Sequence, residues 1–352
     1  MDRHPPAPTE SAAPGSGPTR PVPARQRVFV LGASGTIGLA TARALLRQGH
    51  EVVCWVRPRA GAGGQLTQAD MQRLLPGATM RVGDVQDAAA LARDGFCGEH
   101  FDSWVSCLAS RNGEPKDAWA IDHDAHVQTL AAARRAGVRH VVLLSAICVQ
   151  KPLLAFQRAK LAFEQQLIES GLTYSIVRPT AFFKSLSGQI ERVKQGKPYL
   201  VFGDGRLTAC KPVDDNELGD YLAGCLTEPE RHNRILPIGG PGEALTPLQQ
   251  GELLFQLLGQ PPKFKHVPVR LLDLIVGTLS GAGRFLPSLA AKAELARIGR
   301  YYATESMLVW DAAAGHYDAA ATPSTGSRTL AHHFADVLNG RVCVDRGDHA
   351  VF

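Results

Sequence analysis

The chain has 352 residues, of which 45% are hydrophobic, and a formal net charge of +5 at pH 7. This length allows one large or two modest domains, and the apolar content is ordinary for a globular protein. No stretch of about 18 uncharged apolar residues occurs, so we expect no membrane-spanning helix. The positive charges form no dense run, which argues against a nucleic-acid partner and fits a small anionic ligand.

The N-terminal segment, residues 1–26, is rich in Pro, Ala, Ser and Thr and is predicted to be a disordered tail, because it offers little apolar surface to bury. It lacks the apolar core of a secretory signal, and its acidic residues are untypical of a transit peptide. The seven cysteines are scattered without a C-x-x-C pair or metal-ligand spacing, which indicates reduced thiols and no protein-bound metal. We therefore expect a bacterial cytoplasmic protein, or a chloroplast protein if the chain is a plant precursor.

The first ordered segment predicts a strand, a glycine turn and a helix. Val28–Leu31 is apolar, three glycines follow at a spacing of three, and Ile37–Gln48 has a helical pattern. Such a turn brings unpaired backbone N–H groups and a helix N-terminus to a dinucleotide pyrophosphate, although an ordinary loop is the alternative. The residues predicted to line this turn are Gly32, Ser34, Gly35, Thr36, Ile37 and Gly38.

Strands and helices then alternate as far as residue 185. Further strands are expected at Glu51–Val56, Met80–Val82, Trp104–Cys107, His140–Ser145 and Tyr174–Val177. Helices are expected between them at Asp87–Arg93, Trp119–Ala136 and Phe156–Ser170. This alternation predicts an α/β fold, with a Rossmann-like doubly wound parallel sheet over residues 27–185 that binds a dinucleotide.

Beyond residue 185 the pattern loosens, and residues 186–340 are expected to form a smaller C-terminal substrate-side region that can return strands to the sheet. Helices are predicted at Asp215–Thr227 and Pro247–Leu258, and residues 341–352 are expected to fray. The apolar stretch Leu271–Ala291 fits a buried pair of amphipathic helices or, alternatively, peripheral membrane contact.

The end of the second strand bears on the choice of cofactor. Arg57 stands there, where a NAD-binding corner carries an acidic residue for the ribose. A guanidinium can bind a 2′-phosphate through charge-assisted contacts, so this residue favours NADPH over NADH. The alternative interpretation is a solvated loop charge.

The glycine spacing G-x-x-G-x-x-G resembles that of extended and atypical short-chain dehydrogenases/reductases. This resemblance implies an adenine contact for Asp84, which can equally serve as a helix N-cap, and a cofactor-lining backbone at Cys107. It further implies a catalytic Ser145 and a catalytic Lys160 that also holds the nicotinamide ribose. Phe156 stands where these families carry a tyrosine.

The phenylalanine argues against carbonyl reduction by the usual mechanism. That reaction needs an acid to protonate the forming alkoxide, and Phe156 has no proton to donate. A C=C bond conjugated to a large ring needs less acid assistance, because the charge spreads into the ring. An ordinary amphipathic helix with an i, i+4 pair at Phe156 and Lys160 is the alternative.

Longer segments carry a more specific resemblance. They are residues 143–154, 178–186, 196–199, 202–205, 209–212, 236–242 and 321–326. Over residues 27–340 the chain resembles the NADPH-dependent divinyl chlorophyllide a 8-vinyl reductases of plants and many phototrophic bacteria. The resemblance implies an oxidoreductase of chlorophyll or bacteriochlorophyll biosynthesis, which reduces the 8-vinyl group of a divinyl Mg-tetrapyrrole to ethyl.

The sixth strand is followed by side chains that suit such a substrate. Phe182 and Phe183 are expected to stack on the macrocycle beside Phe156, and Lys184 to pair with its propionate. Core packing of the two phenylalanines and a solvated lysine are the alternatives.

Two other functions are consistent with the same cofactor corner. One is an isoflavone-reductase-like NADPH reductase of a smaller conjugated compound. The other is a non-enzymatic NADPH-binding scaffold or redox sensor, which the lost tyrosine would allow.

Overall fold

The computed structural model of the chain describes residues 25–61, 64–111, 113–283 and 287–342. Nearly all of the predicted tail and of the predicted fraying end lies outside these residues. Seven parallel strands form the main sheet in the order β3-β2-β1-β4-β5-β6-β8. They are β1 (Arg27–Leu31), β2 (Glu51–Val56), β3 (Thr79–Val82), β4 (Ser103–Ser106), β5 (His140–Leu144), β6 (Thr173–Pro179) and β8 (Arg234–Ile238). The predicted Rossmann-like parallel sheet is confirmed, and its order reverses between β1 and β4, where a ligand crevice is expected.

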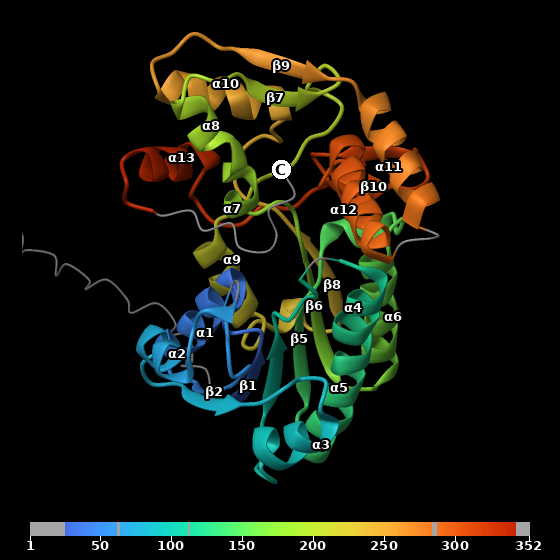
Figure 1. The fold of residues 1–352 in the computed structure, drawn as a ribbon. Coiled ribbons are helices and arrows are strands. Elements are labelled where there is room, and N and C mark those ends of the chain that lie inside the picture. Colours follow the sequence, from blue (N-terminus) through green and yellow to red (C-terminus); the bar gives the residue numbers. More distant parts are fainter. Residues whose placement is uncertain (1–24, 62–63, 112, 284–286, 343–352) are drawn as a thin grey trace, which may run out of the picture.

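Helices cover both faces of this sheet (Figure 1). One face carries α1 (Thr36–Arg47), α2 (Gln68–Leu74) and α9 (Asp215–Gly224). The other carries α3 (Ala88–Ala90), α4 (Pro115–Ala118), α5 (Ala125–Arg135) and α6 (Ala155–Glu169). The result is a three-layer α/β sandwich.

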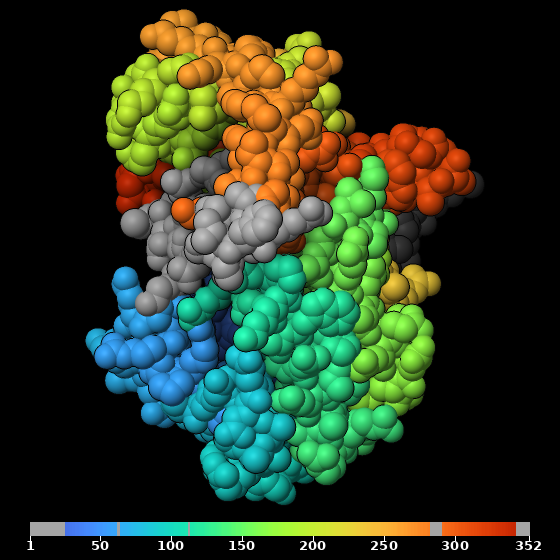
Figure 2. Space-filling model, turned by 45° about the vertical axis from the view of Figure 1, so that its right-hand side comes forward, coloured from blue at the N-terminus to red at the C-terminus, as the bar shows by residue number. Residues whose placement is uncertain are grey.

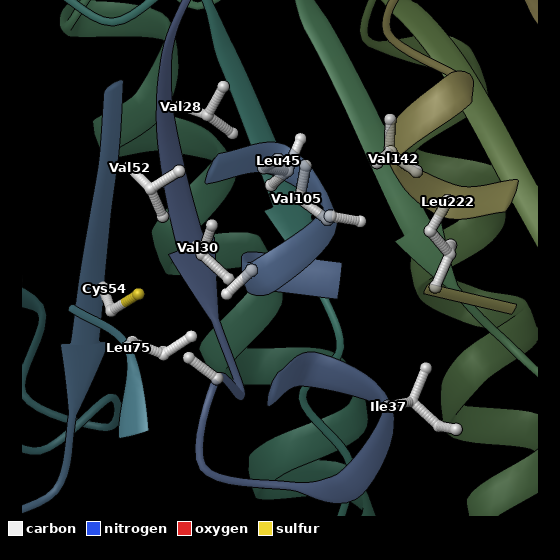
Figure 3. Packing of buried hydrophobic residues seen from close by; sticks show 14 of the residues in the cluster. Val28, Val30, Ile37, Leu45, Val52, Cys54, Leu75, Val105, Val142 and Leu222 are labelled. Atoms are coloured by element: carbon white, nitrogen blue, oxygen red, sulfur yellow. The ribbon is translucent and has the colours of Figure 1, made fainter. Parts of the chain in front are cut away.

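The two cores follow from the two-residue period of the strands. Val28 and Val30 of β1 pack with residues of α1, α2 and α9 (Figure 3). Phe29 and Leu31 point to the opposite face and pack with residues of α5 and α6. Because both faces are buried, the strand reads as an unbroken apolar run.

Short irregular turns join several of these elements. Two are π-helical segments, η2 (Leu91–Phe96) after α3 and η3 (Trp119–Asp124) between α4 and α5, and one is the 3₁₀ turn η4 (Ile147–Gln150) between β5 and α6. The helix expected at 119–136 therefore starts as a π-helix, a geometry often found at functional sites.

A smaller region stands above the carboxyl ends of the strands (Figure 1). It contains the parallel pair β7 (Tyr199–Phe202) and β9 (Phe264–Val267) and the antiparallel pair β10 (Val309–Asp311) and β11 (His316–Asp318). Its helices are α7 (Phe183–Leu186), α8 (Ile190–Lys194), α10 (Pro247–Leu257), α11 (Val269–Gly283), α12 (Pro287–Thr304) and α13 (Leu330–Leu338), with 3₁₀ turns η5 (Ser187–Gln189) and η6 (Pro229–Arg231). The expected helices at 215–227 and 247–258 correspond to α9 and α10.

Two elements from beyond residue 185 return to the main sheet layers. Strand β8, which the sequence did not predict, pairs with β6 at the sheet edge, where Pro237 is tolerated because the outer side has no strand to bond. Helix α9 lies so close to α1 that a Cβ on Gly219 would stand 2.7 Å from the Ala40 carbonyl carbon. The cofactor layer therefore includes part of the C-terminal sequence.

Helices α11 and α12 form the pair that the stretch Leu271–Ala291 suggests, but the pair is not buried. On α11, Leu271, Leu274 and Ile275 are 46%, 63% and 37% exposed. In the space-filling view the orange segment of α11 stands on the surface (Figure 2). The expectation of a buried pair is wrong for α11, whose described side chains contact its neighbours with one face only, whereas α12 buries Ala293, Ile298 and Tyr301.

Candidate active site

The glycine turn lies at the crevice between β1 and β4. Gly32 has φ +78°, and a Cβ there would stand 2.5 Å from the carbonyl carbon and oxygen of Cys107. A Cβ on Gly38 would stand 2.0 Å from the Gly32 carbonyl oxygen. Only glycine fits at these two positions, and the turn, helix α1 and the end of β4 are thereby held in close contact.

The N-terminus of α1 is open to an anion. Its N-cap, Gly35, has no side chain to accept the first N–H groups, and Gly35 and Thr36 are exposed. Ser34 is half-buried, while Ile37 is 7% exposed and offers the crevice little beyond its backbone. This terminus has the features of a phosphate-binding helix end.

Cys107 follows β4 and lies with its backbone against Gly32. Its thiol turns away and contacts the hydroxyl of Thr41 at 3.7 Å. Burial raises the pKa of this thiol to about 12, so it stays protonated. The expected role of Cys107 through its backbone is compatible with this placement.

Arg57 and Asp84 stand at the ends of the neighbouring strands β2 and β3. Arg57 is half-buried and makes no ion pair with any residue that the structure describes. Asp84 is exposed and accepts a hydrogen bond from the Gln86 N–H at 2.9 Å, whereas the N-cap of α3 is Asp87. Asp84 is thus a turn residue rather than the helix cap, and its carboxylate faces solvent.

Lys160 on α6 belongs to a buried polar cluster. Its Nζ lies 3.0 Å from Oδ1 of Asp122, whose side chain is fully buried. The backbone N–H and the hydroxyl of Ser110 donate to the same carboxylate at 3.2 and 2.6 Å. With these donors, the Asp122 carboxylate is held in place and positions the Lys160 side chain in one orientation. No local sequence pattern pointed to Asp122, which reaches Lys160 from the π-helical segment η3.

His126 is buried near this polar cluster. The pKa of His126 is lowered to about 4, first by burial and then by the charge of Lys160. Its Nδ1 lies 2.8 Å from the Ile121 carbonyl, which can only accept, so Nδ1 carries the proton. Nε2 therefore accepts from the Ser106 hydroxyl at 2.8 Å.

Ser145 lies just after β5 but is 5% exposed. Its hydroxyl donates to Oε1 of Glu164 at 2.5 Å, and Glu164 also pairs with Arg178. The proton of Ser145 is therefore held by a buried carboxylate, one turn of α6 beyond Lys160. Its catalytic role stays a prediction.

The residues predicted for the substrate do not come together. Phe183 is 1% exposed and packs in the core of the small region, with its ring 5.2 Å from the His333 ring, a placement that favours the alternative of core packing. Lys184 places its Nζ 3.0 Å from the Thr36 hydroxyl, at the glycine turn rather than at a substrate carboxylate. Phe182 is half-buried against the α1 side of the sheet, so its stacking remains untested.

Phe156 meets helix α12, a contact that the sequence did not suggest. It packs in a cluster with Ile298 and Tyr301, and the Tyr301 hydroxyl donates to the Cys148 carbonyl at 2.9 Å. These residues are about 150 positions apart in the chain, so no local pattern joins them. Phe156 is half-buried and lies one turn before Lys160.

Two further properties concern metals and membranes. The described side chains hold no group of three His, Cys, Asp or Glu placed for a metal ion. Within the described ranges, every helix is too short or too polar to cross a bilayer.

Comparison with known proteins places this site in context. A family model described as NAD(P)H-binding matches residues 32–229. A chloroplastic divinyl chlorophyllide a 8-vinyl-reductase of Zea mays is 46% identical, over 99% of this chain and 88% of its own length. The Arabidopsis thaliana protein of the same name is 48% identical, over 88% of this chain and 76% of its own. The Escherichia coli NADPH-dependent quinone oxidoreductase QOR2, solved with NADPH, has a TM-score of 0.63 at 17% identity, covers 89% of this chain and 100% of its own, and shows the shared fold.

Proposed function

The chain belongs to the divinyl chlorophyllide a 8-vinyl-reductases, and from this membership we propose how its residues carry out the reaction. It is an oxidoreductase that uses NADPH to reduce the 8-vinyl group of divinyl chlorophyllide a to ethyl. The identity of 46–48% over most of the chain disfavours both the isoflavone-reductase-like alternative and the non-enzymatic scaffold.

The glycine turn fits the pyrophosphate of NADPH. Gly32 and Gly38 leave room where a Cβ would collide with backbone, and the open N-terminus of α1 presents unpaired N–H groups. Lys184, held beside Thr36, adds a positive charge at the same place. We therefore reassign Lys184 from the substrate propionate to the cofactor phosphates.

Residues just after β2 and β3 would hold the adenine end of the cofactor, and a residue of α6 would hold its nicotinamide end. Arg57 would bind the 2′-phosphate, which NADH lacks, and Asp84 would lie near the adenine. Lys160, oriented by Asp122, would hold the nicotinamide ribose. The bound cofactor supplies two electrons and one hydrogen to the vinyl group.

The observation that carries this assignment is the ion pair between Lys160 and Asp122, one helical turn beyond Phe156. Lys160 would provide a positive charge at the nicotinamide end of the cofactor, whereas Phe156, at the position of the usual acid, has no proton to donate. Such a site suits a conjugated C=C bond better than a carbonyl, because the developing charge is delocalised over the macrocycle.

The test is an absorbance assay of the purified protein with NADPH and divinyl chlorophyllide a. We expect a small blue shift of the Soret band as the monovinyl product forms, and the same assay with divinyl protochlorophyllide ranks the two substrates. An unchanged spectrum with both substrates, from protein that binds NADPH, would overturn the proposal.

The outer face of α11 supports peripheral contact with a membrane. Leu274 is 63% exposed between Leu271 and Ile275, and the exposed cations Lys265 and Arg270 lie just before and at the start of this helix. An apolar helix face with basic residues beside it suits an anionic lipid surface. Co-sedimentation with anionic vesicles, lost in Leu274→Glu, checks this contact.

The cellular location of the plant relatives differs from the location expected from the composition of this chain. The plant reductases are chloroplastic, so the comparisons do not support the bacterial cytoplasm expected from the composition. A chloroplast location fits these relatives, and we propose it in place of the first expectation.

A further inference from the structure

The segment between β5 and α6, residues 145–154, is where part of the smaller region attaches to the main sheet. It follows β5 at the carboxyl ends of the strands and leads directly into α6, which carries Lys160. Gln150 and Lys151 have no part in the proposed reaction, yet both lie between the predicted site residues Ser145 and Lys160 in the chain. Their side chains bind elements of the smaller region instead.

Gln150 binds backbone groups of β10 and of the residue before it. Its Nε2 donates to the Leu308 carbonyl at 2.7 Å, and its Oε1 accepts from the Trp310 N–H at 2.8 Å. Tyr301 of α12 reaches the same segment, where its hydroxyl donates to the Cys148 carbonyl at 2.9 Å. Helix α12 and strand β10 are therefore both fixed to the segment that follows β5.

Lys151 carries the charged part of this attachment. Its Nζ lies 2.7 Å from Oε2 of Glu305, just past the end of α12, and 4.8 Å from the centre of the Trp310 ring. The Tyr317 hydroxyl donates to the same carboxylate oxygen at 2.7 Å, and Tyr317 is the cross-strand partner of Trp310 in the β10–β11 pair. A cation between a carboxylate and an aromatic face gains from both contacts. Lys151 therefore links the end of α12 to both strands of the β10–β11 hairpin.

This attachment sets where α12 stands relative to α6. Ile298 of α12 packs in one cluster with Phe156, and a Cβ built on Gly113 would lie 2.7 Å from Cδ1 of Ile298 and 3.6 Å from Cδ1 of Phe156. Figure 1 shows α12 and β10 above the upper end of α6. None of these contacts involves the glycine turn, α1 or α9. A shift of α12 and β10 would therefore change the surface beside Phe156 and leave the phosphate-binding end of the cofactor site in place.

We propose that Lys151 is a positioning residue for the tetrapyrrole substrate. Through Glu305 and Trp310 it holds α12 and the β10–β11 hairpin over the start of α6, so that the macrocycle is bound against Phe156 at the nicotinamide end of the cofactor. This assignment rests on the proposed function. Lys151 acts through these neighbours, and its own side chain takes no part in the transfer of hydrogen.

The test compares Lys151→Met with Lys194→Met, a matched control. Each lysine pairs with a glutamate, at 2.7 and 2.9 Å, and the two side chains are 36% and 40% exposed, but Lys194 pairs with Glu191 inside α8. A misplacement of about 1 Å can cost about 10²-fold in rate, so Lys151→Met should lower kcat/KM by about ten- to a hundredfold and raise the Kd of divinyl chlorophyllide a about tenfold. Its Kd for NADPH should stay within about twofold of wild type, because sites without shared contacts act independently. Lys194→Met should leave all three quantities unchanged.

A restoring variant separates positioning from a general loss of folding. Lys151→Arg keeps a cation that can pair with Glu305 and stack on Trp310, so it should recover most of the substrate affinity that Lys151→Met loses. Fluorescence quenching measures both Kd values without turnover. A Lys151→Met protein that binds divinyl chlorophyllide a as wild type does, or that loses NADPH and substrate affinity equally, would overturn the assignment, and so would an equal effect of Lys194→Met. A wild type that binds both ligands and forms no product would count against the proposed function alone, because the comparison of Kd values still tests Lys151.

Discussion

The molecule joins two regions that are held together differently. The cofactor half, residues 27–185 with α9 and β8, has its parallel strands buried between two apolar cores. The smaller region, the rest of the described chain, has two-stranded sheets and smaller cores, and it leaves apolar side chains of α11 exposed. Backbone packing thus fixes the glycine turn, whereas side-chain contacts between separate helices hold the smaller region together.

The largest effect on turnover is expected when the Lys160 side chain is removed. Lys160→Ala should reduce turnover by about 10²-fold or more, because the nicotinamide end loses its cation. It should also cost about 3–5 kcal/mol of stability by leaving the buried Asp122 unpaired. Urea unfolding and steady-state kinetics measure the two effects.

The double variant Lys160→Ala/Asp122→Asn serves as the control. It should regain much of the stability and none of the turnover. Recovery of activity in the double variant would contradict a direct role for Lys160.

Two glycines test whether backbone packing differs between the halves. Gly38→Ala should abolish NADPH binding and destabilise the fold by about 3 kcal/mol, since a Cβ there meets the Gly32 carbonyl oxygen at 2.0 Å. Gly277→Ala on α11 meets nothing within 4 Å and should stabilise the protein by up to about 1 kcal/mol through helix propensity. Thermal unfolding measures the change in stability of each variant, and titration measures its NADPH binding. Equal effects of the two substitutions would contradict a difference in backbone packing between the two regions.

Arg57 tests the preference of the protein for NADPH over NADH. A charge-assisted contact between Arg57 and a 2′-phosphate would contribute about 1.5–3 kcal/mol, so we expect Arg57→Ala to weaken NADPH binding by about tenfold or more. NADH has no phosphate there and should bind almost as before. Equal losses for the two cofactors in calorimetric titrations would rule out this role.

A further prediction concerns the pH dependence of stability. The folded pKa of His126 is about 4, against 6.5 for the free side chain, so the unfolded chain binds the proton more readily. Stability is then full above pH 6.5 and falls as pH drops toward 4, by at most about 1.4 kcal/mol per pH unit. His126→Gln should have a shallower loss than wild type between pH 7 and 5 in urea unfolding, and parallel curves would contradict the neutral buried histidine.

The sequence predicted the cofactor half because its signals are local. The glycine spacing at 32–38, the apolar strands and the ends of β2 and β3 are each contained in a few consecutive residues. The same reasoning could not decide between the crevice and the small core for Phe183, because residues just past a strand end can face either. Asp122 escaped notice because only the folded chain brings η3 to α6.

The central claim, that one hydrogen of the new ethyl group comes directly from NADPH and the other from an exchangeable proton, is tested by isotope labelling. Wild-type protein is given NADPH deuterated at both C4 positions in water, and unlabelled NADPH in heavy water, with divinyl chlorophyllide a in both cases. Mass spectrometry of the product should find one deuterium in the ethyl group from each experiment, on different carbons. An ethyl group that takes both hydrogens from solvent would contradict the account.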